Sequence, residues 1–209
     1  MSAPSILDVV NLSCARGDRT LFRGLSFALA PGELLHVTGR NGSGKTTLLR
    51  TLCALTRPFE GEIRWGGASV RALGDEYRAQ LAYVGHLNGI QGELTPPENL
   101  RASAELAGGA NGDRIDAALE RVALEAYDEF PAKILSQGQK RRLALARLLV
   151  VARPLWVLDE PLSALDVHSV EVMTGVLAAH LNGGGMIILT SHQALDVEAR
   201  TLRMLSLDS

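Results

Sequence analysis

A glycine-rich segment with a single lysine constrains the fold of this chain more than any other feature. It reads GRNGSGKT over residues 39–46, after the apolar run LLHVT and before the helix-forming stretch TLLRTLCAL. Glycines let the backbone curl so that successive N–H groups face one phosphate, and a helix that begins there adds its own free N–H groups. Alone, such a segment is also compatible with a turn that caps a helix. The order of strand, loop and helix predicts a phosphate-binding loop.

The residue types in the loop suit a nucleoside triphosphate with its metal ion. Lys45 supplies a compact cation to the β- and γ-phosphate oxygens, and the Thr46 hydroxyl is a ligand for Mg²⁺. ATP and Mg²⁺ are therefore the expected cofactors. The residues expected to bind the nucleotide here are Gly39, Arg40, Asn41, Gly42, Ser43, Gly44, Lys45, Thr46 and Thr47.

Two later strands end in residues that suit phosphoryl transfer. The run LWVLDE ends in Asp159 and Glu160, and ILTSH ends in His192. Beside a phosphate loop, we expect Asp159 to reach Mg²⁺ and Glu160 to polarise the attacking water. His192 is expected to donate to the γ-phosphate. Without the loop, the acidic pair would be read as a solvated turn and the histidine as a surface or core group.

The order of elements predicts an α/β protein. Residues 6–30 are typical of a small antiparallel layer. Strands at 34–39, 61–65, 81–85, 154–160, 186–191 and 202–207 alternate with helices, including one at 167–181. This alternation predicts a mostly parallel sheet with ligands at the carboxyl ends of its strands. Helical spacing at 95–108 and 113–127 predicts a helical subdomain. We expect one domain, residues 1–209, with a core at 1–86 and 150–209 and the helical subdomain at 87–149.

Composition narrows the class of protein. A chain of 209 residues with 46% hydrophobic residues can bury one sizeable core, and a net charge of −2 gives no general reason to bind nucleic acid, although Lys140–Arg142 form a local basic cluster. Cys14 and Cys53 lie far apart in the sequence and are expected to be reduced packing residues. No apolar run approaches the ~18 residues of a membrane span, and the N-terminus lacks the features of a signal peptide. We expect no membrane crossing by this chain alone.

A second anion site is predicted at the start of a basic helix, in the stretch KILSQGQKRRLALARLL. Ser136, Gln137, Gly138 and Gln139 combine a hydroxyl, two amides and free helix N–H groups. The glycine loop already serves the phosphates of its own subunit. A head-to-tail homodimer would place this helix over the γ-phosphate held by the partner. The alternative is a serine that only caps its own helix.

Taken together, these motifs resemble the nucleotide-binding subunits of ABC transporters. The Walker A motif is GRNGSGKT, the signature motif LSQGQ, the Walker B motif LWVLDE, the D-loop SALD at residues 163–166, and the switch residue His192. The resemblance implies a P-loop NTPase fold with a RecA-like core and a dimer that closes on ATP and is reset by hydrolysis. It also implies that Asp166 belongs to the nucleotide site and that the segment after YVGH contacts a membrane subunit.

Two positions depart from the family pattern. His86 stands where the family usually has a glutamine that touches Mg²⁺ and the attacking water, so His86 is a candidate metal contact. Histidine can replace the hydrogen bonds of glutamine, but its charge varies with pH. Arg16 lies near the place of the aromatic residue that usually stacks on adenine. Only its guanidinium or the nearby Phe22 is available for that contact.

Within the family, the chain resembles the haem-exporter subunits of cytochrome c maturation, the CcmA group. This implies a peripheral protein on the cytoplasmic face of the bacterial inner membrane, with membrane-spanning partners of the CcmB and CcmC type, that supports haem delivery. No C-x-x-C-H haem motif is present. The alternatives are an ATPase for another exported substrate, such as a lipid, polysaccharide or drug, and a soluble ABC protein acting on ribosomes or nucleic acid.

Overall fold

The central element of the protein is a five-stranded parallel sheet. In the computed structural model, residues 6–17, 19–109, 112–192, 197 and 199–208 are described. The strand order is β6-β7-β8-β3-β9, and every neighbouring pair is parallel. This confirms the predicted α/β class with a mostly parallel sheet. The strands are β3 (Glu33–Thr38), β6 (Leu81–Val84), β7 (Leu155–Asp159), β8 (Met186–Thr190) and β9 (Thr201–Ser206).

A four-stranded antiparallel sheet forms a second β layer, with the order β2-β1-β4-β5. The register of β1 shifts between Val10 and Ser13, where Asn11 has φ of 49°. A Cβ on Gly61 of the neighbouring strand would lie 2.4 Å from the Asn11 carbonyl oxygen, so this close approach requires glycine. The strands are β1 (Leu7–Arg16), β2 (Arg19–Leu29), β4 (Glu60–Trp65) and β5 (Ala68–Ser69).

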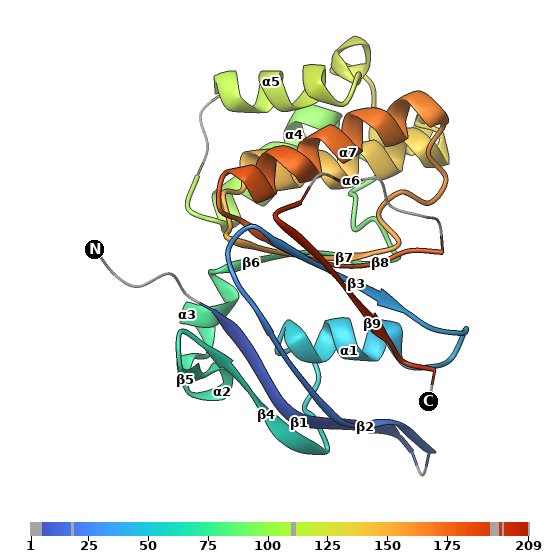
Figure 1. Cartoon of the computed structure of the whole chain (residues 1–209). Helices are drawn as coiled ribbons and strands as arrows, with labels where there is room; N and C mark the ends of the chain where they lie inside the picture. The colour runs from blue at the N-terminus through green and yellow to red at the C-terminus, as the bar shows by residue number, and fades with distance from the viewer. Residues whose placement is uncertain (1–5, 18, 110–111, 193–196, 198, 209) are drawn as a thin grey trace.

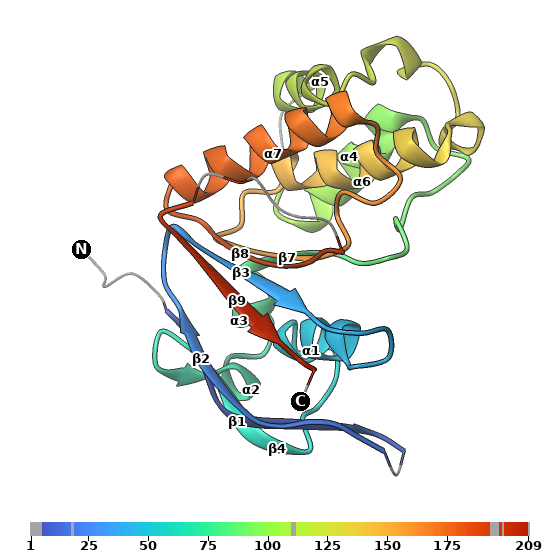
Figure 2. The same cartoon turned by 45° about the vertical axis from the view of Figure 1, so that its right-hand side comes forward.

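Helix α1 lies between the two sheets, and α4, α6 and α7 lie on the other side of the parallel sheet, with α5 outside them (Figures 1 and 2). The inner helix is α1 (Lys45–Leu52), and the short α2 (Val70–Leu73) and α3 (Asp75–Arg78) follow β5. The outer layer contains α4 (Pro96–Leu106), α5 (Gly112–Arg121), α6 (Gln137–Val150) and α7 (Val167–Asn182), with the 3₁₀ turns η1 (Glu125–Tyr127) and η2 (Ala132–Ile134).

Helix α5 is shorter than the sequence predicts. Helical spacing continues to residue 127, but the helix ends at Arg121 because Ala123 adopts the left-handed conformation, with φ of 52°. The Leu124 N–H then donates to the Leu119 carbonyl, which closes the end of the helix. The remaining apolar residues continue into η1.

The parallel sheet separates two hydrophobic cores because neighbouring residues on a strand face opposite sides. Leu34, Trp156 and Ile187 pack under the outer helices, while their neighbours Leu35, Val157 and Ile188 pack toward α1 and the antiparallel sheet. Both cysteines are free and buried, and burial raises the pKa of Cys53 to about 12. This fits their predicted packing role.

The helices α4 and α5 fall within the predicted helical subdomain at 87–149, and α6 ends one residue beyond it, at Val150. Their buried apolar residues belong to the same core as the sheet residues that pack under the outer helices, such as Leu34 and Trp156. The division into subdomains therefore stays a prediction. Among the described helices, none combines the length and the apolar character that a membrane span requires.

Candidate functional site

The carboxyl ends of four neighbouring strands supply the candidate site. His86 follows β6, and the glycine loop follows β3. Asp159 ends β7, Glu160 comes directly after it, and His192 follows β8. The strand order places these ends in one row along the sheet edge. They meet at a cavity of about 520 Å³, lined by Arg16, Leu21, Asn41, Gly42, Gly44, Lys45, Thr46, Thr47, His86, Asp159, Glu160, Ser163 and His192.

The glycine loop has the backbone conformation that its composition predicts. Gly42 and Gly44 have φ of 82° and 106°, values that other residues rarely adopt. Gly44 precedes α1 and offers no side-chain cap to it. The first turn of α1 therefore presents N–H groups toward the cavity, a donor set that fits a phosphate group.

Lys45 lies folded back over this loop. Its Nζ donates to the Gly39 carbonyl at 2.7 Å and to the Arg40 carbonyl at 3.3 Å. Both acceptors are neutral, so the ammonium charge has no anionic partner in these contacts. An incoming phosphate would supply that partner.

Three predicted loop residues lie outside the cavity lining. The Arg40 side chain is exposed, and its backbone N–H donates to Asp208 Oδ1 at 2.7 Å. A Cβ on Gly39 would lie 2.6 Å from Ser43 Oγ, so Gly39 is needed for the turn itself. Arg40 and Ser43 instead line a hollow on the neighbouring side of the loop.

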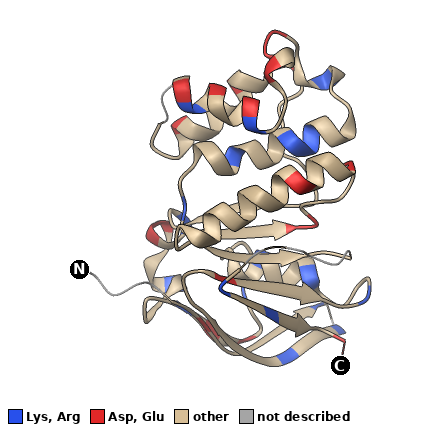
Figure 3. Ribbon diagram, turned by 45° about the horizontal axis from the view of Figure 1, so that its top comes forward, with Lys and Arg blue, Asp and Glu red and all other residues tan. Residues whose placement is uncertain are grey.

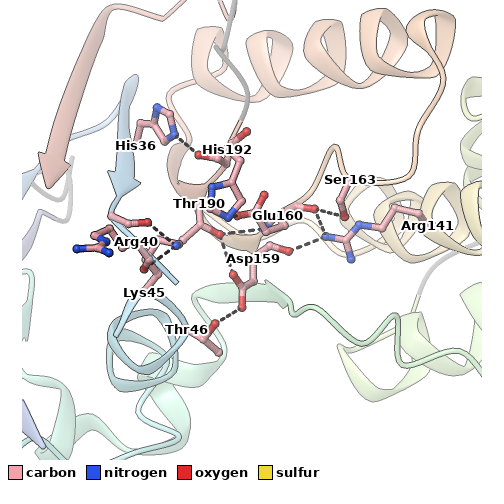
Figure 4. A network of polar contacts seen from close by, with 12 residues as sticks. His36, Arg40, Lys45, Thr46, Arg141, Asp159, Glu160, Ser163, Thr190 and His192 are labelled. Carbon is pink, nitrogen blue, oxygen red and sulfur yellow. Dashed lines mark hydrogen bonds and ion pairs between the residues drawn. The ribbon is translucent and has the colours of Figure 1, made fainter. Parts of the chain in front are cut away.

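A chain of hydrogen bonds connects the loop to both acidic residues (Figure 4). The Thr46 hydroxyl donates to Asp159 Oδ2 at 2.8 Å, and the Thr190 hydroxyl donates to Asp159 Oδ1 at 2.7 Å. Thr190 Oγ1 also accepts the Glu160 N–H at 2.9 Å. Asp159 is 3% exposed. Thr46 on α1 and Thr190 on β8 orient its two carboxylate oxygens.

One oxygen of the Glu160 carboxylate is available to accept a further hydrogen bond. Its Oε1 atom is buried without a hydrogen-bond partner among the described residues, and lies 3.4 Å from His192 Nε2 (Figure 4). The two groups therefore lie close together without a hydrogen bond between them. A buried carboxylate oxygen with a free lone pair can accept a proton from a bound water.

The signature residues do not line this cavity. Ser136 Oγ accepts the Gln139 N–H at 3.2 Å, and Gln139 Oε1 accepts the Ser136 N–H at 2.8 Å, which forms a capping box on α6. Asp166 is likewise the cap of α7, where it accepts the Ser169 N–H at 2.7 Å, and this bond lowers the pKa of Asp166. Within one subunit, Ser136 and Asp166 therefore begin helices, and neither lines the cavity beside the glycine loop.

Arg141 is a residue whose position the sequence analysis missed. We assigned it to a basic cluster at Lys140–Arg142, but Arg141 is 3% exposed and donates to the carbonyls of Asp159 and Glu160. The surface interpretation is wrong for this residue. Its helical spacing of four and seven from the buried Leu145 and Leu148 was the available indication, since residues so spaced share one face.

Charged residues of both signs are distributed over the helical and β layers (Figure 3). Among the described residues, no group of three or more His, Cys, Asp or Glu side chains is arranged to hold a metal ion. Thr46 and Asp159 offer two neighbouring oxygen ligands beside the loop, which fits a Mg²⁺ ion that arrives with phosphate and keeps several waters.

Comparison with known proteins agrees with this geometry. The family model described as ABC transporter matches residues 22–163. The "Cytochrome c biogenesis ATP-binding export protein CcmA" of Dechloromonas aromatica is 53% identical over 97% of this chain and 100% of its own length. The protein of the same name from Nitrosomonas europaea is 50% identical over 99% of both chains.

A solved structure gives the same result for the fold. A putative ABC transporter ATP-binding protein from Pyrococcus furiosus superposes with a TM-score of 0.84 at 27% identity, over 96% of this chain and 97% of its own. The chain belongs to the ABC transporter family, as an ATP-binding and ATP-hydrolysing subunit of the group of cytochrome c biogenesis export proteins called CcmA.

Proposed function

We propose that this protein works as a head-to-tail homodimer that hydrolyses Mg²⁺-ATP and thereby powers a membrane complex for haem export or delivery in cytochrome c maturation. One observation carries the proposal for the site. Four adjacent strand ends bring the glycine loop, Asp159, Glu160, His86 and His192 around one cavity. Each part of phosphoryl transfer has a side chain there with suitable chemistry.

The glycine loop and Lys45 would bind the phosphates. The Nζ atom would exchange its two carbonyl acceptors for phosphate oxygens, and the N–H groups of the first turn of α1 would donate alongside it. This exchange replaces neutral acceptors with charged ones, so it favours the bound state.

Thr46, Asp159 and His86 would surround the metal ion. When bound, Mg²⁺ would neutralise charge on the β- and γ-phosphate oxygens. Asp159 is already fixed by Thr46 and Thr190, so it needs no reorientation. His86 is exposed and lines the cavity directly after β6, a place from which it can contact an ion or the attacking water.

Glu160 would accept the proton of the attacking water, and His192 would donate to the γ-phosphate. The free Oε1 lone pair of Glu160 supports the first role. The side chain of His192 is 60% exposed and stands at the cavity mouth, which supports the second. The 3.4 Å approach of the two groups keeps the base and the donor on the same side of the cavity.

The second subunit would complete each site with Ser136–Gln139 and the neighbourhood of Asp166. In one chain these residues begin α6 and α7 and leave the cavity mouth open to solvent. The N-terminus of α6 carries a serine, two amides and no acidic residue in its first turn, which suits it to an anion. A symmetric dimer is the simplest arrangement that brings an anion to it.

The membrane complex would contain spanning subunits of the CcmB and CcmC type, with this protein peripheral on the cytoplasmic face of the inner membrane. The support is the identity to export proteins whose names place them in cytochrome c biogenesis. The segment after β6 is a suitable contact, because the Leu87 side chain is 84% exposed directly beside His86.

Complementation in a strain that lacks the corresponding gene would test this assignment. The parent chain should restore c-type cytochromes, and the Glu160→Gln variant should not. Recovery of membrane subunits after mild solubilisation, with affinity-tagged protein as bait, would identify the partners. Normal c-type cytochromes in the deletion strain would refute the role in maturation and favour another exported substrate.

A further inference from the structure

A single buried guanidinium joins the signature helix to the catalytic strand ends. Arg141 lies in the first half of α6 and is 3% exposed. Its Nη2 atom donates to the carbonyls of Asp159 and Glu160, each at 2.7 Å, and its Nε donates to the Pro161 carbonyl at 3.0 Å. Arg141 thus holds three consecutive peptide carbonyls at the end of β7. Figure 4 shows its contacts to Asp159 and Glu160.

The same guanidinium also reaches the end of β6. Its Nη1 atom donates to the Gly85 carbonyl at 2.9 Å and to Asn88 Oδ1 at 3.2 Å. These two residues flank the segment that contains His86. One side chain therefore fixes both the backbone of the proposed water-activating residue and the backbone beside the proposed metal contact.

All five N–H donors of Arg141 are used in these bonds. A guanidinium has five donors in a planar fork, and the five contacts match them in number. Lysine has three donors on one atom, so it cannot span the same acceptors. The site therefore requires the shape of arginine as well as its charge.

The Glu160 backbone needs this support. Its φ is 51°, a left-handed conformation that residues other than glycine rarely adopt and that surrounding contacts must maintain. Thr190 accepts the Glu160 N–H, and the Glu160 carbonyl accepts from Arg141 Nη2 and from Ser163 Oγ at 2.8 Å. This conformation sets where the carboxylate points (Figure 4).

The charge of Arg141 is held without a direct ion pair. Its acceptors are four backbone carbonyls and one side-chain amide. Burial lowers the pKa of Arg141, while the nearby carboxylates of Asp159 and Glu160 act in the opposite direction. The guanidinium is therefore held in place by its hydrogen bonds. Replacement of the guanidinium would break all five of these bonds together.

We propose that Arg141 is a positioning residue for ATP hydrolysis, which couples the position of the signature helix to the Glu160 carboxylate and to His86. The inference rests on the proposed role of Glu160 in activating water. Because Arg141 lies on the same helix as Ser136–Gln139, a shift of that helix against a partner subunit would be transmitted to the water-activating group by one rigid side chain.

The test is the steady-state ATPase kinetics of Arg141→Lys, with Arg142→Lys as the matched control. Arg142 is the next residue of α6 and donates to the Val122 and Ala123 carbonyls, away from the cavity. We expect Arg141→Lys to lower kcat about 100-fold with KM and nucleotide affinity within about twofold of the parent, because small displacements of a reacting group cost rate rather than binding. Arg142→Lys should retain kcat.

A double-mutant cycle with Glu160→Gln separates positioning from a general structural role. In the Glu160→Gln background, Arg141→Lys should lower the residual turnover by no more than about twofold, because the carboxylate that it positions is gone. An equal fold-loss in both backgrounds would overturn the inference. If Arg141→Lys does not fold, as judged by circular dichroism and nucleotide binding, the same cycle uses Arg141→Gln, which buries no unpaired charge.

Failure of this inference differs from failure of the proposed function. Parent-like kcat in Arg141→Lys or Arg141→Gln, with Glu160→Gln inactive, would overturn the positioning role and leave Glu160 in place. Parent-like kcat in Glu160→Gln itself would remove the proposed water-activating role, and the positioning role with it.

Discussion

The Thr46 hydroxyl donates a 2.8 Å hydrogen bond to Asp159 Oδ2, which joins the first turn of α1 to the end of β7. The two residues are 113 positions apart in the sequence. The contact brings together the two oxygen groups that are best placed to hold Mg²⁺ beside the glycine loop. The bond orients both side chains, so the two proposed Mg²⁺ ligands already lie side by side.

Replacement of Thr46 by valine should weaken Mg²⁺-dependent nucleotide binding. Valine has a similar shape but no hydroxyl, so one oxygen ligand and the bond to Asp159 are both lost. We expect the affinity for Mg²⁺-ATP to fall about 10- to 100-fold, measured by calorimetry with and without Mg²⁺. Thr46→Ser keeps the hydroxyl and should remain close to the parent. An unchanged Mg²⁺ dependence in Thr46→Val would refute the assignment of this ligand.

Glu160→Gln should bind ATP but hydrolyse it slowly. The glycine loop, Thr46 and Asp159 remain, while the group that accepts the proton of water is lost. We expect phosphate release to fall about 10²- to 10⁴-fold and a dimer to accumulate with ATP in size-exclusion chromatography. Absence of a dimer at saturating ATP would contradict the shared nucleotide site.

Lys45→Ala should lower the affinity for ATP. The ammonium group now bonded to the Gly39 and Arg40 carbonyls is the cation expected to meet the β- and γ-phosphates. Loss of a hydrogen bond to a charged group costs about 1.5–3 kcal/mol, which corresponds to about 10- to 100-fold in affinity. Equilibrium binding of a fluorescent ATP analogue measures the change, and parent-like affinity would argue against this loop as the phosphate site.

Gly138→Asp should abolish hydrolysis by placing a carboxylate against the partner's γ-phosphate. A Cβ at Gly138 would also lie 2.9 Å from the Ala164 carbonyl of the same chain, so bulk alone disturbs the site. Gly138→Ala is the control, because it adds that Cβ without a charge. We expect a further loss of ATPase activity from alanine to aspartate. Equal activities of the two variants would count against an anion at this position.

From the burial of His180 we predict how the free energy of unfolding depends on pH. Its ring stacks on Trp156 with a centroid distance of 3.7 Å, and burial lowers the pKa of His180 from 6.5. The unfolded chain therefore binds a proton more readily, and the free energy of unfolding should fall as the pH drops below about 6.5. His180→Gln should reduce the difference in unfolding free energy between about pH 7.5 and pH 5.5, measured by urea titration.

The exposed His168 provides the control for this experiment. His168→Gln should leave the pH dependence close to that of the parent, because the His168 side chain is exposed in the folded protein. An unchanged pH dependence in His180→Gln would show that other groups determine the loss of stability in acid.

The parts of the site that the sequence predicted are those that local patterns encode. The glycine loop and the carboxylates of β7 follow short apolar runs, and their order along the chain places them at one sheet edge. Thr190 and Arg141 were missed because their roles depend on pairing between segments far apart in the sequence. For the same reason, the partnership of β4 with β1 became clear only in the structure.

Local charge also misled the interpretation of α6. Three consecutive basic residues suggested a solvated cluster, yet the helix turns Arg141 inward and leaves Lys140 to bond the Lys133 carbonyl. The end of α5 shows a similar limit, because its apolar spacing continues past the left-handed Ala123. Spacing reports which face is apolar, whereas contacts from other segments decide where a helix ends and which charges are buried.

The capping box at Ser136 gives one side chain two compatible tasks. A hydroxyl accepts through its lone pairs and donates through its hydrogen, and the bond from the Gln139 N–H uses only a lone pair. That bond leaves the hydroxyl hydrogen available for another acceptor. Ser136 can therefore stabilise the start of α6 and bind an anion of a neighbouring molecule at the same time. Neither task requires a change of its rotamer.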